Sequence, residues 1–287
     1  MFSKVYLFDN TPGGIPQEKS AEFRRLGCAY AGTGENHGIA FALNRVMETA
    51  ARDGYEWVVA FDQDFSFAPN MAEEYTKHTA DEKNGILCPV LWDKRRGYRK
   101  FHGKEGTSEL NYAVTSGSCT RVSAWEHAGK YDEDLFIDLV DHDFSKRVRY
   151  AGYRLLRVDS VLMGHESGIV EPRKVGGKLI GSLADLFRSP LLGRLCYRKT
   201  VVPMRVYYTN RNMLYLNKRH KRYGGIGYES YDCRGYLSFF LLFNFASFLR
   251  GREKARILKA ILSGVKDGRR MAKAAGSYEI PSAFDGR

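Results

Sequence analysis

The chain has 287 residues, 44% of them hydrophobic and 27% charged, which is typical of a folded globular protein with one large domain, with or without an appendage. Its five cysteines are scattered and lack CxxC spacing, a pattern that argues against a disulfide framework or a zinc site and favours a reducing cytosol. The net charge of +12 is concentrated in residues 172–287, which contain 24 Lys and Arg but 7 Asp and Glu. This part of the chain is therefore expected to bind phosphate groups, with a solvated basic surface as the alternative.

Strands and helices alternate in the first ninety residues. Apolar runs predict strands over 4–8, 28–30, 57–61 and 86–91, and apolar residues at helical spacing predict helices over 39–52 and 70–81. Such alternation is typical of a parallel sheet with crossover helices. We therefore expect the chain to begin with an α/β domain.

The pattern continues beyond residue 91 with more interruptions. Residues 92–109 are polar and basic and are expected to form an excursion or a loop. Strand-like residues over 114–120 surround a turn of small residues, helices are expected over 123–128 and 141–151, and strands over 153–158 and 160–163 end near His165. The α/β domain is expected to cover residues 1–205.

Residues 206–287 are expected to form a basic, amphipathic helical tail. Their most hydrophobic stretch, 236–249, is too short to cross a bilayer, which needs about 20 apolar residues. The next predicted helix, 252–274, has an apolar face surrounded by lysines and arginines, which is typical of binding at a membrane surface. That face consists of Ile257, Leu258, Ile261, Leu262 and Val265. The alternative is that both helices pack on the rest of the chain or on a second copy in a homo-oligomer.

Two carboxylates follow the apolar strand over 57–61. Asp62 and Asp64 stand there with one residue between them. Mg²⁺ and Mn²⁺ prefer oxygen ligands and bind through one or two protein carboxylates, leaving positions for water and phosphate oxygens. Open α/β sheets bind ligands at the carboxyl ends of their strands. The pair thus predicts a site for a divalent cation, with an exposed Asp-x-Asp turn as the alternative.

Several motifs occur in a fixed order along the chain. They are Asp9-Asn10 after the first strand, N-x-G-I-A-x-A-x-N from Asn36 to Asn44, Asp62-Gln63-Asp64, Phe136-Ile137-Asp138 with Asp141 behind it, His165 with Gly168, and Y-Y-x-x-R-N over 207–212. This series resembles the inverting family 2 glycosyltransferases of the GT-A fold, particularly the bacterial rhamnosyltransferase branch. The resemblance covers residues 5 to about 215. It implies a Rossmann-like, mostly parallel sheet with flanking helices. The sequence departs from the family in one respect: the strand and helix that the family has before the Asp-Asn pair are expected to be absent, or their role to be taken elsewhere in the chain.

The resemblance implies the residues of the donor side. Asp9 would accept a hydrogen bond from the donor's pyrimidine ring, Asn36 and Gly38 would lie near the donor, and Asp62 would lie near its ribose. Asp64 would bind the Mg²⁺ or Mn²⁺ that bridges the diphosphate, with His165 as a further metal ligand. The structural alternatives are a turn residue for Asp9, a helix cap for Asn36 and a core histidine for His165.

The resemblance also places the family's general base at Asp141. In a single displacement, one carboxylate must take the proton of the acceptor hydroxyl as that hydroxyl attacks the anomeric carbon. Asp138 and Asp143 flank Asp141 and are expected to raise its pKa, unless they are helix N-terminal charges that the helix dipole favours. The acceptor side would be lined by Ser116, Gly117, Ser118 and Asp138. Arg147 and Arg211 are expected to meet phosphate or to pair with the aspartates.

The implied function is transfer of L-rhamnose from dTDP-rhamnose to a lipid-linked or polysaccharide acceptor of the cell envelope. The enzyme would be cytoplasmic and bound peripherally to the anionic inner face of the cell membrane. No nucleic acid is expected, because no RNP, helix-turn-helix or zinc pattern is present. Two alternatives stay open. Residues 61–66 are similar to the strand end of haloacid-dehalogenase-type phosphatases, with Asp62 as nucleophile and Asp64 as acid, and the basic tail would also suit a non-catalytic membrane- or nucleic-acid-binding module.

Overall fold

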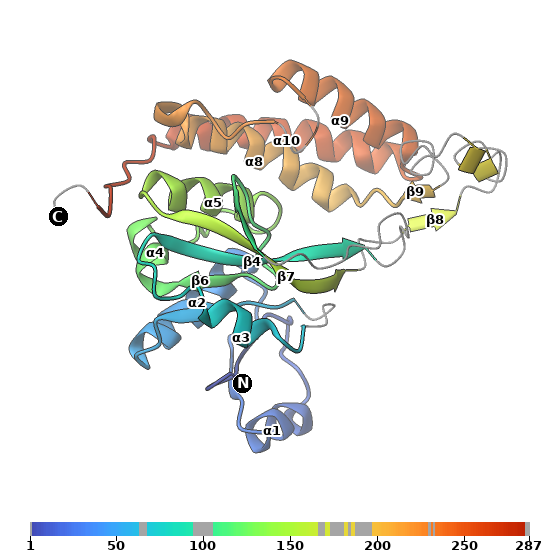
Figure 1. Ribbon diagram of the computed structural model, residues 1–287. Helices are drawn as coiled ribbons and strands as arrows, with labels where there is room; N and C mark the ends of the chain where they lie inside the picture. Colours follow the sequence, from blue (N-terminus) through green and yellow to red (C-terminus); the bar gives the residue numbers. More distant parts are fainter. Residues whose placement is uncertain are drawn as a thin grey trace. The chain divides into compact units, whose positions relative to one another are not determined.

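The computed structural model describes residues 2–62, 68–93, 106–165, 170–172, 181–182, 185–186, 197–228, 231 and 233–284 (Figure 1). The chain divides into two compact units. Unit 1 contains the described residues up to 92, those over 106–164 and those from Tyr278 onward, whereas unit 2 contains Asp93 and the described residues within 165–277. The C-terminal residues from Tyr278 thus belong to unit 1, and the division of the chain at residue 205 stays a prediction.

Unit 1 is built on a five-stranded sheet with the strand order β3-β6-β4-β7-β5. The strands are β3 (Trp57–Val59), β4 (Asn84–Asp93), β5 (Thr107–Leu110), β6 (Cys119–Arg121) and β7 (Arg154–His165). β7 joins the two strands predicted over 153–158 and 160–163. A separate parallel pair consists of β1 (Tyr6–Asp9) and β2 (Ala29–Gly32).

The strand directions depart from the expected mostly parallel arrangement. β6 is antiparallel to both β3 and β4, and β5 is antiparallel to β7. β3 and β4 therefore point the same way, as the predicted crossover through α3 (Met71–Thr76) requires. The difference arises because the chain reverses at Gly117, whose φ of 79° favours glycine, and β6 then inserts between β3 and β4. The α/β class is confirmed.

The remaining helices of unit 1 are α1 (Gln17–Arg25), α2 (Ile39–Arg52), α4 (Val122–His127) and α5 (Val140–Tyr150). α2 has the bounds predicted from its apolar spacing. The sequence does not predict α1, because its nine largely polar residues show no apolar stripe. In Figure 1, α5 lies on one side of the five-stranded sheet and α3 on the other. α3 contributes Met71 and Tyr75 to a core that includes Leu87, Val161 and Met163.

The last described residues pack on unit 1. The Ala283 N–H donates to the carbonyl of Ala151 at 2.9 Å. The Phe284 ring lies against Gly152, where an added Cβ would be 2.9 Å from it. The Tyr278 hydroxyl donates to the carboxylate of Asp132. This segment thus covers the C-terminal end of α5 and the loop before it.

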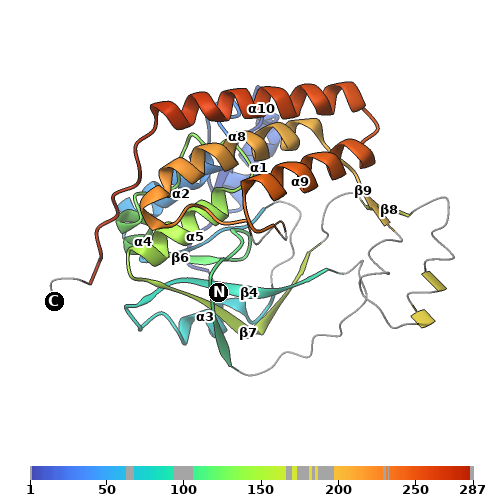
Figure 2. The ribbon, with the colours of Figure 1, turned by 90° about the horizontal axis from the view of Figure 1, so that it is seen from above.

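Unit 2 contains the short antiparallel pair β8 (Val170–Pro172) and β9 (Tyr197–Lys199), and the helices α8 (Pro203–Arg219), α9 (Tyr236–Arg250) and α10 (Lys254–Ala274), with a 3-10 turn over Lys221–Tyr223. The three helices lie side by side (Figures 1 and 2). A Cβ added at Gly264 would be 2.5 Å from the carbonyl oxygen of Tyr207, and one at Gly268 would be 2.6 Å from that of Arg211. Equal steps of four residues on both helices show that α8 and α10 run parallel, at a distance that only glycine permits.

Buried amides join α8 to α9. The Asn210 and Asn244 side chains each donate to the other, at 2.8 and 2.9 Å. Val206, Ile257 and Ile261 form the adjoining apolar core. The helices predicted over 236–249 and 252–274 are therefore confirmed as α9 and α10. None of the helices in the described part of the chain combines the length and the hydropathy that spanning a membrane requires.

Candidate active site

The first strand ends with Asp9 inside a turn. Its carboxylate accepts hydrogen bonds from the backbone N–H groups of Thr11 (2.9 Å) and Ile15 (2.8 Å) and from the Tyr30 hydroxyl (2.6 Å). The hydrogen bond from Tyr30, together with those from the backbone, lowers the pKa of Asp9 to about 2 although burial opposes it. Because an ionised carboxylate has about four lone-pair sites, one remains for a ligand.

Two asparagines hold the segment before α2. Asn10 accepts from the His37 N–H at 3.1 Å and donates to the Gly38 carbonyl at 3.0 Å, while Asn36 accepts from the Gly38 N–H at 3.0 Å. Gly38 has a φ of 89°, and an added Cβ would lie 2.5 Å from the carbonyl oxygen of Phe136, so this position favours glycine twice over. These contacts bring together the turn after β1, the start of α2 and the loop before α5.

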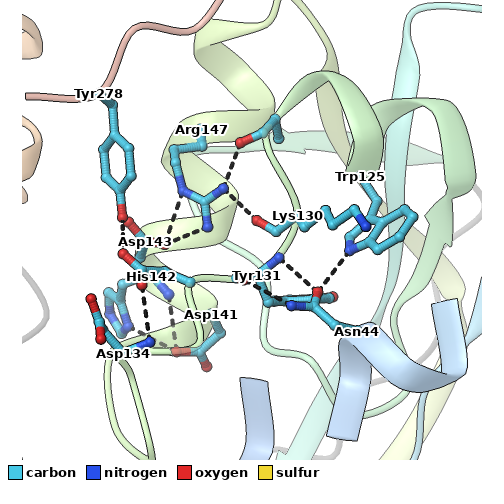
Figure 3. A network of polar contacts seen from close by, with 12 residues as sticks. Asn44, Trp125, Lys130, Tyr131, Asp134, Asp141, His142, Asp143, Arg147 and Tyr278 are labelled. Carbon is cyan, nitrogen blue, oxygen red and sulfur yellow. Dashed lines mark hydrogen bonds and ion pairs between the residues drawn. The ribbon is translucent and has the colours of Figure 1, made fainter. Parts of the chain in front are cut away.

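Asn44, which closes the N-x-G-I-A-x-A-x-N motif, connects α2 with the same loop. Its side-chain oxygen accepts from the Trp125 indole N–H at 3.0 Å and from the Tyr131 N–H at 2.9 Å, and its amide donates to the Tyr131 carbonyl at 2.9 Å (Figure 3). The residue is almost fully buried. This end of the motif therefore anchors α2 and does not face a ligand.

The end of β3 lies beside the small-residue turn that precedes β6. The Asp62 N–H donates to the Ser116 hydroxyl at 3.0 Å. The Gly117 N–H donates to the Ala60 carbonyl at 2.7 Å, and the Ala60 N–H donates to the Ser118 carbonyl at 3.1 Å. Asp62 is exposed, whereas Ser116 and Ser118 are buried. The turn thus fixes the backbone that carries Asp62. That Ser116, Gly117 and Ser118 line the acceptor side remains a prediction.

Two left-handed residues precede α5. Asp138 and Leu139 both have a φ of 65°, a conformation that costs a non-glycine residue about 1–2 kcal/mol. Leu139 is buried, and its carbonyl accepts from the Asp143 N–H at 2.9 Å. The strained turn therefore sets the direction in which α5 leaves the loop and with it the position of Asp141. Such strain persists where surrounding packing enforces it, often at functional sites.

Asp141, in the first turn of α5, is held by two side chains. Its Oδ2 accepts from the Tyr112 hydroxyl at 2.7 Å. Its Oδ1 lies 3.2 Å from His142 Nδ1 (Figure 3). The Tyr112 and His142 rings stack with centroids 3.9 Å apart. Burial raises the pKa of Asp141, but the hydrogen bonds and charge of His142 and the bond from Tyr112 outweigh burial and lower it overall. The expectation that acidic neighbours raise this pKa is therefore wrong, because the nearest groups are hydrogen-bond donors.

Asp143 is part of a buried ion pair. Its Oδ2 lies 2.6 Å from Nη2 and 2.9 Å from Nε of Arg147, and the two side chains are 0% and 1% exposed. Arg147 also donates to the carbonyls of Ala128 and Lys130 (Figure 3). The carboxylate of Asp143 raises the pKa of Arg147 in spite of burial. Arg147 is expected from the sequence either to bind phosphate or to pair with an aspartate, and the structure shows the pairing with Asp143. Arg211 lies in unit 2, where it donates to Asn212 at 2.8 Å and stacks on Tyr208.

One short segment connects the Asp62 and Asp141 neighbourhoods. Tyr112 reaches Asp141, the backbone N–H of Ala113 donates to the Ser145 hydroxyl of α5 at 3.1 Å, and Ser116 reaches Asp62. Ser116 follows Tyr112 by four positions, so their Cα atoms lie at most about 14 Å apart even if the chain is extended. The two predicted site carboxylates therefore share one region of unit 1.

The expected metal ligands fall largely outside the described residues. This holds for Asp64 and for the side chain of His165, whose backbone ends β7. Within the described ranges, no group of three or more His, Cys, Asp or Glu side chains is placed to hold a metal ion. Asp62, two positions before Asp64, is exposed. Its carboxylate supplies the oxygen ligands that Mg²⁺ and Mn²⁺ prefer. The chemistry of this strand end fits a divalent cation bound together with a phosphate-bearing ligand.

Sequence reasoning missed Tyr112 and His142 as partners of Asp141. Tyr112 precedes Asp141 by 29 residues and belongs to no motif. Its one signal is an aromatic residue directly before the small-residue stretch over 113–118. His142 stands inside the acidic motif, where only the fold shows that its ring turns back to Asp141.

Comparison with known proteins finds a sequence similarity between this chain and a glycosyltransferase. No protein-family model matches the chain. The dTDP-rhamnosyl transferase RfbF of Shigella flexneri is 28% identical over 179 residues, which cover 57% of this chain and 60% of that protein. The chain thus spans about three fifths of the length of this curated relative. The resemblance to the rhamnosyltransferase branch of the family 2 glycosyltransferases is confirmed by this match.

Similar solved structures include two glycosyltransferase complexes. GalNAc-T7 with UDP, GalNAc and Mn²⁺ is 13% identical and aligns over 85% of this chain and 51% of its own, with a TM-score of 0.49. The mannosyltransferase PcManGT from Pyrobaculum calidifontis in complex with GDP-Man and Mn²⁺ is 16% identical and aligns over 96% and 67%, with a TM-score of 0.46.

Proposed function

We propose that the chain is an inverting glycosyltransferase that moves L-rhamnose from dTDP-rhamnose to a lipid-linked or polysaccharide acceptor of the cell envelope. The motif order and the similarity to a dTDP-rhamnosyl transferase support this class. The observation that carries the proposal is the setting of Asp141. Its carboxylate has a lowered pKa, is 27% exposed and is held by two side chains close to the end of β3.

In the proposed reaction, the acceptor hydroxyl oxygen forms a bond to the anomeric carbon from the side opposite dTDP. The bond from that carbon to the diphosphate oxygen breaks, and its electron pair leaves with dTDP, so the configuration inverts. The hydroxyl proton moves to the Asp141 carboxylate. Tyr112 and His142 keep this carboxylate ionised and fix its orientation before the acceptor arrives.

The donor side is proposed to comprise Asp9, Asn36, Gly38 and Asp62. Asp9 would use its remaining lone-pair site for the pyrimidine ring, and the backbone of Gly38 would border the donor. Asp64, with His165, would hold Mg²⁺ or Mn²⁺, which when bound neutralises charge on the leaving diphosphate. The acceptor would approach over Asp138 and the turn at Ser116–Ser118.

A donor screen tests the proposal. Ligand binding to the native state raises stability by RT ln(1 + [L]/Kd), so dTDP-rhamnose with Mn²⁺ should raise Tm more than UDP- or GDP-sugars do. NMR of the transferred sugar should show the anomeric configuration opposite to that of the donor. Retention of configuration would contradict the single displacement. Hydrolysis of p-nitrophenyl phosphate would instead support the phosphatase alternative.

A separate calorimetric titration tests the metal. Affinity for dTDP should fall strongly when EDTA replaces Mn²⁺, and Asp64→Ala should remove this difference while the chain stays folded. Equal dTDP affinity with and without EDTA in the unsubstituted protein would contradict a bridging cation.

A further inference from the structure

One side of α9 is apolar and uncovered. Five side chains on it, each more than half exposed, recur at helical spacing: Leu237, Leu241, Leu242, Phe245 and Leu249. The opposite side carries the buried Phe239, Asn244 and Ser247. Most exposed apolar residues of a soluble protein are scattered singly, so a continuous stripe of this kind marks a contact surface.

Beside this stripe, an open groove of about 760 Å³ runs between α9 and α10. It is lined by Phe240 of α9 and by residues within 261–274 of α10. Along α10 the lining changes in character. Ile261, Leu262 and Val265 come first, and the last turns supply only cations and small side chains. The groove therefore presents an apolar end and a basic end to the same ligand.

The basic end is not neutralised by neighbouring carboxylates. Lys266, Arg269 and Lys273 are exposed and form no ion pair with any residue that the structure describes. Arg270 pairs with Asp267, the one acidic residue of α10, at 3.2 Å. Asp267 also accepts from the Tyr207 hydroxyl of α8 at 2.8 Å, so it is engaged within unit 2. Three cations are thus left to meet an external anion.

We propose that α9 and α10 form an interfacial docking surface for a bilayer that contains anionic phospholipid. The stripe on α9 enters the boundary between headgroups and acyl chains, and Lys266, Arg269 and Lys273 contact the headgroup phosphates. An apolar face with cations at its edge is the pattern of helices that lie in the membrane interface. A second copy of the chain pairing through the same face would bring these cations together, and nucleic acid offers no apolar surface for α9.

The docking surface deepens the proposed function, on which its purpose rests, because it would hold the enzyme where a lipid-linked acceptor resides. Its binding chemistry is independent of the donor. Each cation near an anionic surface adds attraction that salt screens over about 8–10 Å, whereas the apolar contact is insensitive to salt. Docking should therefore weaken with salt without disappearing.

Vesicle sedimentation with the full chain tests the inference. Vesicles of phosphatidylcholine and phosphatidylglycerol in equal parts should bind the protein, and vesicles of phosphatidylcholine alone should bind it much less. The triple variant K266Q/R269Q/K273Q should weaken binding to the anionic vesicles about tenfold or more at low salt. The matched control K4Q/K19Q/R25Q removes three exposed charges from unit 1 and should leave binding unchanged.

The apolar part has its own pair of variants. Leu241→Ser with Phe245→Ser should reduce the binding that survives high salt, whereas Leu26→Ser, at an even more exposed site of unit 1, should not. The response of Tm to dTDP-rhamnose should be the same in all variants, which separates loss of docking from failure of the proposed function. Equal vesicle binding by the triple variant and its control would overturn the inference. So would a change of oligomeric mass in the α9 variant with vesicle binding intact, because the face would then join two copies of the chain.

Discussion

Asp141 and Asp143 stand two residues apart on α5, yet their surroundings differ completely. Residues at this spacing do not share a helix face. Asp141 is 27% exposed and receives donors from Tyr112 and His142, whereas Asp143 is 0% exposed and pairs with Arg147. The acidic cluster of the sequence therefore contains one accessible carboxylate suited to accept a proton and one that holds the helix in place.

Replacing Asp141 with Asn should lower the rate of sugar transfer by about 10²–10⁴, since a positioned proton acceptor contributes that much. The stabilisation by dTDP should stay unchanged, because the substitution keeps the size of the side chain. Steady-state transfer assays and thermal shift with dTDP measure the two effects. A variant with full activity would exclude Asp141 as the base.

Asp143→Asn serves as the contrasting variant. It leaves Arg147 buried without its anion, so the free energy of unfolding in urea should fall by about 3 kcal/mol. Any variant that remains folded should transfer sugar nearly normally. If Asp138→Asn has the largest effect on turnover, the base is Asp138 and the family motif aligns three positions earlier than assumed.

Tyr112→Phe should alter the pH dependence of transfer. The tyrosine hydroxyl donates to the ionised form of Asp141, so its removal raises the pKa of that carboxylate. Because Asp141 acts in its ionised form, the acid limb of the kcat/KM profile should move to higher pH, by about one pH unit. Tyr55→Phe is the control, since among the described aromatic pairs the Tyr55 ring forms only a T-shaped pair with Tyr6. An unmoved acid limb would reduce Tyr112 to a packing role.

At the scale of elements, the candidate site depends on where helices begin. α2 starts against the Phe136 loop through Gly38, and α5 starts after the left-handed pair Asp138 and Leu139. Both starts converge on the same loop. The motifs around residues 36 and 138 therefore pack against each other in one contact region, although about a hundred residues separate them in the sequence.

Gly38→Ala should disrupt the contact between the start of α2 and the Phe136 loop. The added Cβ would lie 2.5 Å from the Phe136 carbonyl oxygen at a φ of 89°. Gly54→Ala is a matched control, because Gly54 has a φ of 83° with nothing within 4 Å of an added Cβ. Urea unfolding should show a loss for Gly38→Ala that exceeds the control by about 1–3 kcal/mol, the usual cost of overpacking. Affinity for dTDP should fall only in the Gly38 variant. Equal losses would mean that the contact yields without strain.

At the scale of the whole molecule, the chain ends in the unit where it begins. After the helices of unit 2, residues from Tyr278 return to unit 1. The Tyr278 ring lies over the guanidinium of Arg147 at 5.1 Å, and its hydroxyl reaches Asp132. The C-terminal segment therefore completes the packing around the buried ion pair of α5.

A chain that ends at Ser277 should consequently lose stability in unit 1. Removal of the Tyr278 hydrogen bond and of the Phe284 contact should cost about 1–3 kcal/mol of unfolding free energy. Vesicle binding should persist, because α9 and α10 are retained. A chain that ends at Phe284 is the control and should unfold like the full chain. Equal urea midpoints for the two truncated chains would show that the returning segment is dispensable.

Local pattern in the sequence was sufficient for the α/β class, for the bounds of α2, for α9 and α10, and for the resemblance to rhamnosyltransferases, which a similar protein supports. Apolar spacing and turn residues act over a few positions, so they can be interpreted without the fold. Only the tertiary structure decided the antiparallel insertion of β6, the packing of Tyr278 on unit 1 and the hydrogen bond from Tyr112 to Asp141. These features join residues that lie 29 to 146 positions apart, as in the Tyr112–Asp141 and Tyr278–Asp132 hydrogen bonds, and no local propensity encodes such pairings. The same reason explains why the sequence predicts an acidic cluster that raises a pKa, whereas the folded chain surrounds Asp141 with donors that lower it.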